Sequence, residues 1–200
     1  MDERAALPAE AGTTSGEFVV TAFSIVGLSS GASRLSPCSI LVASLIDALV
    51  ERSYSLGRVF HLVEAETAAA PTWIDHVEQA DLLVLGVQMD RGGLQRFERH
   101  LDLVGAHGLV DKTVLLASVA DRPNRTTGLE QVIRPLVVAR GAHVLPHTVR
   151  ATHAGMAGRR LVDPELARDV RAVADRVAAG LDTKEAFCPA ELHGLVRAHC

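Results

Sequence analysis

Five short apolar runs divide the chain into repeating units, and a segment with helical periodicity follows each run. The runs are rich in Val, Leu and Ile and carry few charges, which is typical of strands buried on both faces of a parallel sheet. We predict strands at residues 18–27, 58–63, 81–87, 112–119 and 142–149. The run Asp-Leu-Leu-Val-Leu-Gly-Val at 81–87 has the pattern of a central strand.

Between the strands, apolar residues recur at intervals of three and four, which places them on one face of a helix. We predict helices at residues 37–53, 72–80, 94–104, 128–140 and 164–179. Pro37 favours the start of the first helix, because its fixed φ suits a first turn. The alternation predicts an α/β fold: a five-stranded parallel sheet with right-handed crossovers and helices on both faces.

The length of 200 residues suits one domain with a single sheet. We expect this domain to span residues 17–181. Residues 1–16 are small and polar, and they predict a mobile leader. Residues 182–200 predict either a tail or a short extra helix.

Composition and charge exclude several classes of function. Hydrophobic residues make up 48% of the chain, which argues against a disordered protein. The formal net charge is -4, so nothing favours nucleic acid as a partner. No uncharged apolar run reaches the roughly 18 residues that a membrane helix needs, and the N-terminus lacks the order of a secretory signal.

The three cysteines, Cys38, Cys188 and Cys200, are scattered and odd in number. They form neither a CxxC pair nor a disulfide framework, so we expect a reducing, cytoplasmic location. Cys38 lies at a predicted helix start, where a thiol can have a lowered pKa; the alternative is an ordinary buried cysteine.

Ligands of open parallel sheets bind beyond the carboxyl ends of the strands, which selects the loops 27–36, 87–93 and 119–127. The first loop reads Gly-Leu-Ser-Ser-Gly-Ala-Ser-Arg-Leu-Ser and leads into a helix. Its hydroxyls, its arginine and the N–H groups of the helix start suit a phosphate. The phosphate-binding candidates are Ser29, Ser30, Ser33, Arg34 and Ser36. The alternative is a serine-rich connection that only caps the helix.

This loop is neither a Walker loop nor a GxGxxG fingerprint, and it lacks the acidic residues of a phosphate-accepting response regulator. The letters Gly27-x-Ser29-x-Gly31 fit a hydrolase nucleophile elbow, which Asp121 and His147 could complete. However, the loop is longer than a sharp elbow requires. No metal is predicted, because His143 and His147 have no clustered carboxylate or cysteine beside them.

Several segments, in their order and spacing, resemble the NAD(P)H-dependent FMN reductase family over residues 18–180. They are the loop GLSSGASRLS, then ADLLVLG at 80–86, LDLV at 101–104, VDKTV at 110–114 and IRPL at 133–136. The resemblance implies a flavodoxin-like fold and a homodimer or homotetramer. It also implies FMN across the three loops with its phosphate in 28–36, NADH or NADPH stacked on the flavin, and a possible flavin-dependent monooxygenase partner.

The loops expected around the flavin ring depart from the family pattern. A Thr/Ser-Pro-Val/Ile-Tyr stretch is replaced by Val-Gln-Met-Asp at 87–90, and Thr-Gly-Gly by Ser-Val-Ala-Asp at 118–121. The ring contacts implied here are Gln88, Met89, Asp90 and Arg91 on one side, and Ala120, Asp121 and Arg122 on the other. A carboxylate at Asp90 would lower the flavin's reduction potential unless Arg91 or Arg122 neutralises it.

The basic loop 122–127 has two interpretations. Its arginines suit a nicotinamide nucleotide phosphate, or it is a solvated turn in which Thr126 or Thr127 caps the next helix.

Two functions follow from the sequence. The first is an FMN-binding, NAD(P)H-dependent oxidoreductase, in which hydride passes from nicotinamide to flavin and no side chain need be catalytic. The alternative is a non-catalytic flavodoxin-like protein that serves as an oligomeric or partner subunit.

Overall fold

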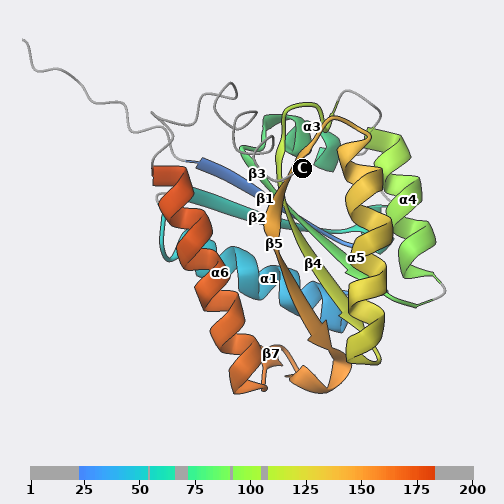
Figure 1. The fold of residues 1–200 in the computed structure, drawn as a ribbon. Coiled ribbons are helices and arrows are strands. Elements are labelled where there is room, and N and C mark those ends of the chain that lie inside the picture. Colours follow the sequence, from blue (N-terminus) through green and yellow to red (C-terminus); the bar gives the residue numbers. More distant parts are fainter. Residues whose placement is uncertain (1–22, 54, 66–71, 91, 105–107, 183–200) are drawn as a thin grey trace, which may run out of the picture.

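Five parallel strands form one sheet in the order β2-β1-β3-β4-β5 (Figure 1). The computed structural model describes residues 23–53, 55–65, 72–90, 92–104 and 108–182. The strands are β1 (Phe23–Ser29), β2 (Ser55–His61), β3 (Leu82–Gln88), β4 (Thr113–Ala120) and β5 (His143–Thr152). The strand order reverses direction between β1 and β3, which makes this the topological switch point of the sheet.

Helices cover both faces of the sheet, as predicted (Figure 1). One face carries α1 (Pro37–Val50) and α6 (Pro164–Asp182). The other carries α3 (Thr72–Gln79), α4 (Gly93–Val104) and α5 (Pro123–Val138), with the short α2 (Leu62–Ala65) beside α4. After β5 the chain forms a short 3-10 turn (His153–Gly155) and a small hairpin of β6 (Met156–Ala157) and β7 (Arg160–Leu161), which leads into α6.

All five predicted strands and helices are present, but several boundaries were wrong. β1 extends to Ser29, so this residue ends a strand instead of belonging to the loop. β2 begins at Ser55, earlier than residue 58, and α5 begins at Pro123, earlier than residue 128. The stretches Ser-Leu-Gly at 55–57 and Pro-Asn-Arg-Thr-Thr at 123–127 have no apolar periodicity from which regular structure could be predicted. The predicted leader at 1–16, the start of the first strand and the tail after residue 182 lie outside the described residues.

Three glycines let α1 lie unusually close to the sheet. A Cβ at Gly27 would be 2.6 Å from Val42 Cγ1, and one at Gly86 would be 2.2 Å from Val42 Cγ2. A Cβ at Gly57 would be 2.4 Å from Ile46 Cγ2. These glycines lie on β1, β3 and β2, so together they form a side-chain-free path beneath the helix. We call this path the glycine cradle of α1.

A bulge interrupts the edge strand β5. Its pairing with β4 changes from Val114–Val144 to Leu116–Thr148, so extra residues of β5 bow out of the ladder. From α5, Arg134 Nη1 donates to the carbonyl oxygens of Leu145, at 3.0 Å, and Val144, at 3.5 Å. The arginine thereby satisfies backbone acceptors that the bulge removes from the sheet.

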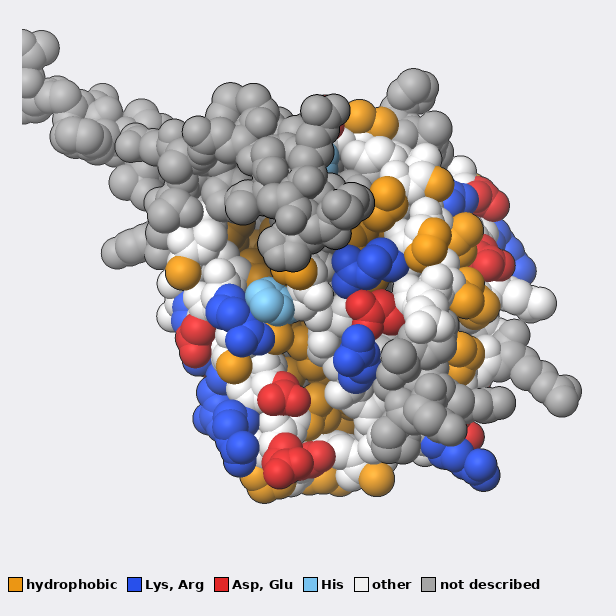
Figure 2. All heavy atoms as spheres, viewed as in Figure 1, with side chains coloured by type: hydrophobic (Ala, Val, Ile, Leu, Met, Phe, Trp, Pro, Cys, Tyr) orange, Lys and Arg blue, Asp and Glu red, His pale blue; other side chains and the backbone are white. Residues whose placement is uncertain are grey.

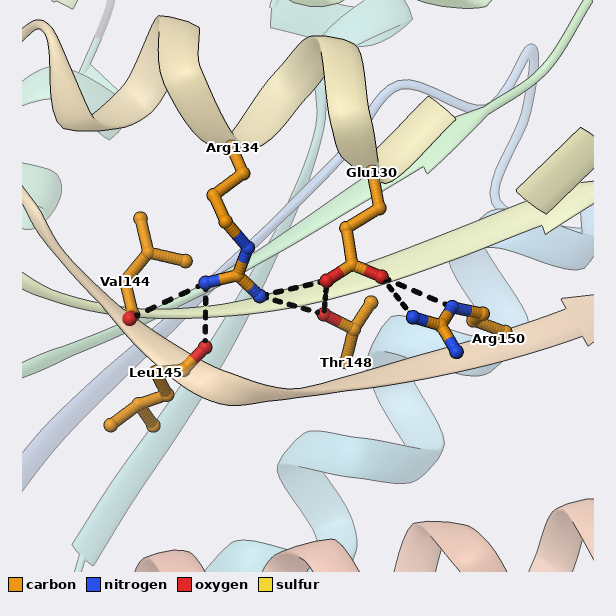
Figure 3. Close-up of polar contacts among 6 residues, drawn as sticks. All are labelled: Glu130, Arg134, Val144, Leu145, Thr148 and Arg150. Atoms are coloured by element: carbon orange, nitrogen blue, oxygen red, sulfur yellow. Dashed lines mark hydrogen bonds and ion pairs between the residues drawn. The ribbon is translucent and has the colours of Figure 1, made fainter. Parts of the chain in front are cut away.

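Glu130 joins this arginine to the neighbouring part of β5 (Figure 3). Its Oε1 accepts from Arg134 Nη2 and from Thr148 Oγ1, both at 2.8 Å, and its Oε2 accepts from Arg150. Burial opposes ionisation of Glu130, but the hydrogen bonds from Arg134, Arg150 and Thr148 outweigh it and hold the pKa below its ordinary value. The cluster therefore fastens α5 to the sheet edge with a charged carboxylate.

The glycine cradle predicts that Gly86→Ala destabilises the fold by about 1–3 kcal/mol, because Val42 has a restricted rotamer and cannot move aside. Gly180→Ala is the matched control, since nothing lies within 4 Å of a Cβ built there; it should be neutral or stabilise by up to about 1 kcal/mol. Urea unfolding measures both. Equal changes in the free energy of unfolding for the two variants would show that close contact of α1 with Gly86 does not require a glycine.

For Glu130 the lowered pKa predicts stability that is present above the ordinary carboxyl pKa of about 4.3 and is lost as the pH falls through the lower folded value. At pH 7, Glu130→Gln should lose about 1–2 kcal/mol, because two arginines lose a charged acceptor. The difference in free energy of unfolding between wild type and variant, measured with urea, should become smaller near pH 3. A difference that stays constant with pH would show that the charge of Glu130 does not contribute to stability.

Candidate functional site

The β1–α1 loop, residues 30–36, lies at the switch point and is tied to β3. Ser30 N–H donates to the Gly86 carbonyl at 3.0 Å, and Ser30 Oγ accepts from Gln88 N–H at 2.9 Å. The Ser30 carbonyl in turn accepts from Arg96 Nη1, on α4, at 2.6 Å. We refer to residues 30–36 as the phosphate loop, after the role proposed for it below.

Three of the four serines expected to hold a phosphate are buried and bond within the protein. Ser29 Oγ lies 2.9 Å from Ser39 Oγ, and Ser30 bonds β3 as described. Ser36 is the N-cap of α1, and its Oγ accepts from Ser39 N–H at 3.3 Å. The capping interpretation is therefore correct for Ser36.

Ser33 and Arg34 are exposed on the outer side of this loop. The Ser33 hydroxyl accepts from Leu35 N–H at 3.3 Å, which leaves its proton for another acceptor. Gly31 allows the loop to close tightly, because a Cβ there would lie 1.8 Å from Ser36 Oγ. The result is a narrow backbone turn over the positive end of α1, which is the geometry that suits a phosphate group.

The second loop follows β3 and is organised by Asp90. Its Oδ1 accepts from Gly93 N–H at 2.6 Å and from Gly92 N–H at 3.0 Å, at the start of α4. Its Oδ2 accepts from Gln88 Nε2 at 2.8 Å. The carboxylate thus caps a helix and is not the isolated charge that the sequence suggested. Met89 is half-buried, and Arg91 lies outside the described residues.

The amide orientation of Gln88 follows from its partner. Asp90 can only accept, so the NH₂ group must face it and Oε1 must face away. Gln88 Oε1 is buried and has no partner among the described residues. A buried acceptor without a donor is uncommon.

The third loop follows β4. Ala120 is buried at the strand end, while Asp121 and Arg122 are exposed. Arg122 is the N-cap residue of α5 and makes no side-chain capping bond, because a guanidinium has no acceptor to offer the helix N–H groups. The prediction that Thr126 or Thr127 caps this helix was therefore wrong. Both residues lie within α5.

Neither nucleophile considered from the sequence suits catalysis. Ser29 is fully buried at the carboxyl end of β1, whereas His147 lies in a cavity with Thr113, at the amino end of β4. A Ser–His pair is thus excluded by the topology. Burial raises the pKa of the Cys38 thiol to about 11, although hydrogen bonds from Ser29 and the loop backbone act in the opposite direction. The ordinary buried cysteine is the correct interpretation.

Among the residues that the structure describes, no group of three or more His, Cys, Asp or Glu side chains is placed to hold a metal ion. No helix there combines the length and apolar character needed to cross a membrane.

The sequence pattern did not reveal three residues that shape the site: Arg96, Ser39 and His61. Arg96 lies on α4 and reaches the phosphate loop. Ser39, in the first turn of α1, and His61, at the end of β2, meet beneath the same loop, with Nδ1 3.0 Å from Oγ. Their separation along the chain leaves no local pattern from which the contact could be read.

The capping role of Asp90 predicts that Asp90→Ala lowers the free energy of unfolding by about 1–2 kcal/mol. Asp90→Asn keeps an oxygen for the two N–H groups and should lose less than half as much. Asp169→Ala, an exposed aspartate on α6, is the control and should change stability by no more than about 0.5 kcal/mol. Urea unfolding provides the measurement; a loss for Asp90→Ala no larger than that of Asp169→Ala would mean that the cap contributes nothing.

Comparison with known proteins places this geometry in context. No family model matches the chain. The NADH-dependent FMN reductase SfnE of Pseudomonas putida is 32% identical over 169 residues, which cover 78% of this chain and 91% of that protein. The FMN reductase (NADPH) of Pseudomonas aeruginosa is 29% identical over 169 residues, with the same shares of 78% and 91%.

Solved structures agree on the fold. The apo form of the NADH:FMN oxidoreductase EMOB superposes with a TM-score of 0.66 at 22% identity, over 79% of this chain and 89% of that one. An archaeal flavodoxin gives a TM-score of 0.57 at 10% identity, over 80% and 98% of the two chains. The predicted flavodoxin-like fold is thus confirmed. With a relative above 30% identity matched over nearly its whole length, this chain belongs to the NAD(P)H-dependent FMN reductase family.

Proposed function

We propose that the protein is an FMN-binding, NAD(P)H-dependent oxidoreductase. The observation that carries the proposal is the tight turn of the phosphate loop over the N-terminus of α1, at the switch point of the sheet. Membership of the FMN reductase family supports the same conclusion.

In this proposal the FMN phosphate is held by the Ser33 hydroxyl, the Arg34 guanidinium and backbone N–H groups of the loop. Ser29, Ser30 and Ser36 contribute indirectly, because their hydroxyls shape the turn. This division of roles follows from burial: exposed groups meet the ligand, and buried groups fix the backbone.

The ring of FMN would lie between the second and third loops. Gln88, Met89, Asp90 and Arg91 border one side, and Ala120, Asp121 and Arg122 the other. Bound FMN supplies the hydride-accepting chemistry, so these residues need only bind and orient the ring.

We also propose a cytoplasmic homo-oligomer, a homodimer or homotetramer. Apolar side chains gather on the outer side of α4 and α5 (Figure 2). Leu103, Val132 and Val138 are about half exposed there, at 56%, 47% and 51%, and such a patch favours contact with another protein surface. A flavin-dependent monooxygenase that receives reduced flavin is the further partner proposed.

An FMN titration followed by flavin fluorescence tests the function. We expect saturable binding of one FMN per chain. Ser33→Ala/Arg34→Ala should weaken it by about ten- to a hundredfold, because a hydroxyl and a charged contact are lost. NADH or NADPH added without oxygen should then bleach the oxidised-flavin absorbance.

Leu35→Ala is the matched control, since Leu35 is an exposed apolar residue of the same loop; FMN affinity should be unchanged. Absence of binding at micromolar FMN would refute the proposal and favour the non-catalytic partner subunit. Binding without bleaching by either nucleotide would separate flavin binding from reductase activity.

A further inference from the structure

Ser39 occupies the centre of a polar cluster beneath the phosphate loop. Its Oγ donates to the Ser33 carbonyl oxygen at 2.8 Å. Three further groups surround Ser39 Oγ: Ser29 Oγ at 2.9 Å, Ser36 Oγ at 3.0 Å and His61 Nδ1 at 3.0 Å. With 1% of its surface exposed, Ser39 has no direct access to a ligand. Its hydroxyl therefore acts on the loop and not on whatever the loop binds.

The direction of these hydrogen bonds follows from counting protons. A hydroxyl has one proton and two lone pairs, and a carbonyl can only accept. The Ser39 proton therefore points to the Ser33 carbonyl, and the two lone pairs of Ser39 Oγ can accept from two of its three other neighbours. With its own proton used in this way, Ser39 can bond to His61 Nδ1 only as an acceptor, so this bond requires the tautomer that carries a proton on Nδ1. An asparagine amide at position 61 could make the same donation, whereas a leucine could not.

The Ser33 carbonyl is thereby turned into the protein, where it also accepts from Ser36 N–H at 3.1 Å. In a planar trans peptide the N–H points opposite to the C=O. The N–H side of the peptide between Ser33 and Arg34 is thus directed away from the cluster. An outward carbonyl would repel an anion, so its orientation determines how well this turn accepts a phosphate.

We propose that Ser39 and His61 form a positioning pair that holds the Ser33 carbonyl inward and so gives the site its selectivity for a phosphorylated flavin. The inference rests on the proposed function and adds two residues to it. Ser39 is buried and His61 bonds to it beneath the loop, so both act through the Ser33 carbonyl. Their contribution therefore concerns the phosphate and leaves the ring contacts unchanged.

The test compares FMN with riboflavin, which has the same ring and no phosphate. Dissociation constants of both are measured by fluorescence for wild type, Ser39→Ala, His61→Leu and His61→Asn. Ser39→Ala and His61→Leu should weaken FMN binding by about tenfold and change riboflavin binding by less than about twofold. His61→Asn should restore the wild-type ratio of the two affinities.

Ser44→Ala is the matched control, because Ser44 is a half-buried serine of α1 in a groove facing α6, away from the loop. The positioning role would be overturned if Ser39→Ala and His61→Leu weakened FMN and riboflavin binding equally, or if both left the ratio of the two dissociation constants unchanged. If Ser39→Ala does not fold, the comparison of His61→Leu with His61→Asn decides. Failure of the wild type to bind FMN would instead refute the proposed function.

Discussion

The rest of the structure depends on the close contact between α1 and the sheet. Gly27, Gly57 and Gly86 leave no side chain between the helix and three adjacent strands, so Val42 and Ile46 rest directly on the backbone. A helix that sits this deep has little freedom to slide or tilt, because protein interiors are close-packed and resist overlap. Its N-terminus is therefore fixed at the carboxyl ends of β1 and β3, and the ligand loop begins from a rigid support.

In the phosphate loop that begins from this support, buried groups hold the backbone in place and exposed groups are left to bind. The hydroxyls of Ser29, Ser36 and Ser39 bond one another beneath the loop, while Arg96 and β3 hold Ser30 from the other side. A loop whose polar groups are satisfied internally loses little conformational freedom when a ligand arrives. Preorganisation of this kind leaves the helix N-terminus and the outer residues to act on the anion.

The sequence predicted the architecture well because apolar periodicity is a local property of strands and helices. It failed at residues 55–57, which read Ser-Leu-Gly, and at 123–127, which read Pro-Asn-Arg-Thr-Thr, because neither stretch has an apolar periodicity although both belong to regular structure. For the site, the order of elements identified the right three loops. It did not show which serines face inward, because this depends on partners such as His61 and Ser39, which lie 22 residues apart. The resemblance to the family identified an overall function, but it did not provide the inner network.

Asp90 illustrates how a departure from a family pattern can be compensated by geometry. In the sequence it is a carboxylate beside a ring that gains negative charge on reduction, and it would disfavour that reduction. In the fold the same carboxylate accepts hydrogen bonds from two backbone N–H groups at the start of α4 and from the side-chain amide of Gln88. The partial positive charge of a helix N-terminus offsets part of a nearby negative charge. The field on the proposed ring site is therefore that of a capped helix end, which is weaker than the field of a lone carboxylate, and the substitution at position 90 is compatible with flavin reduction.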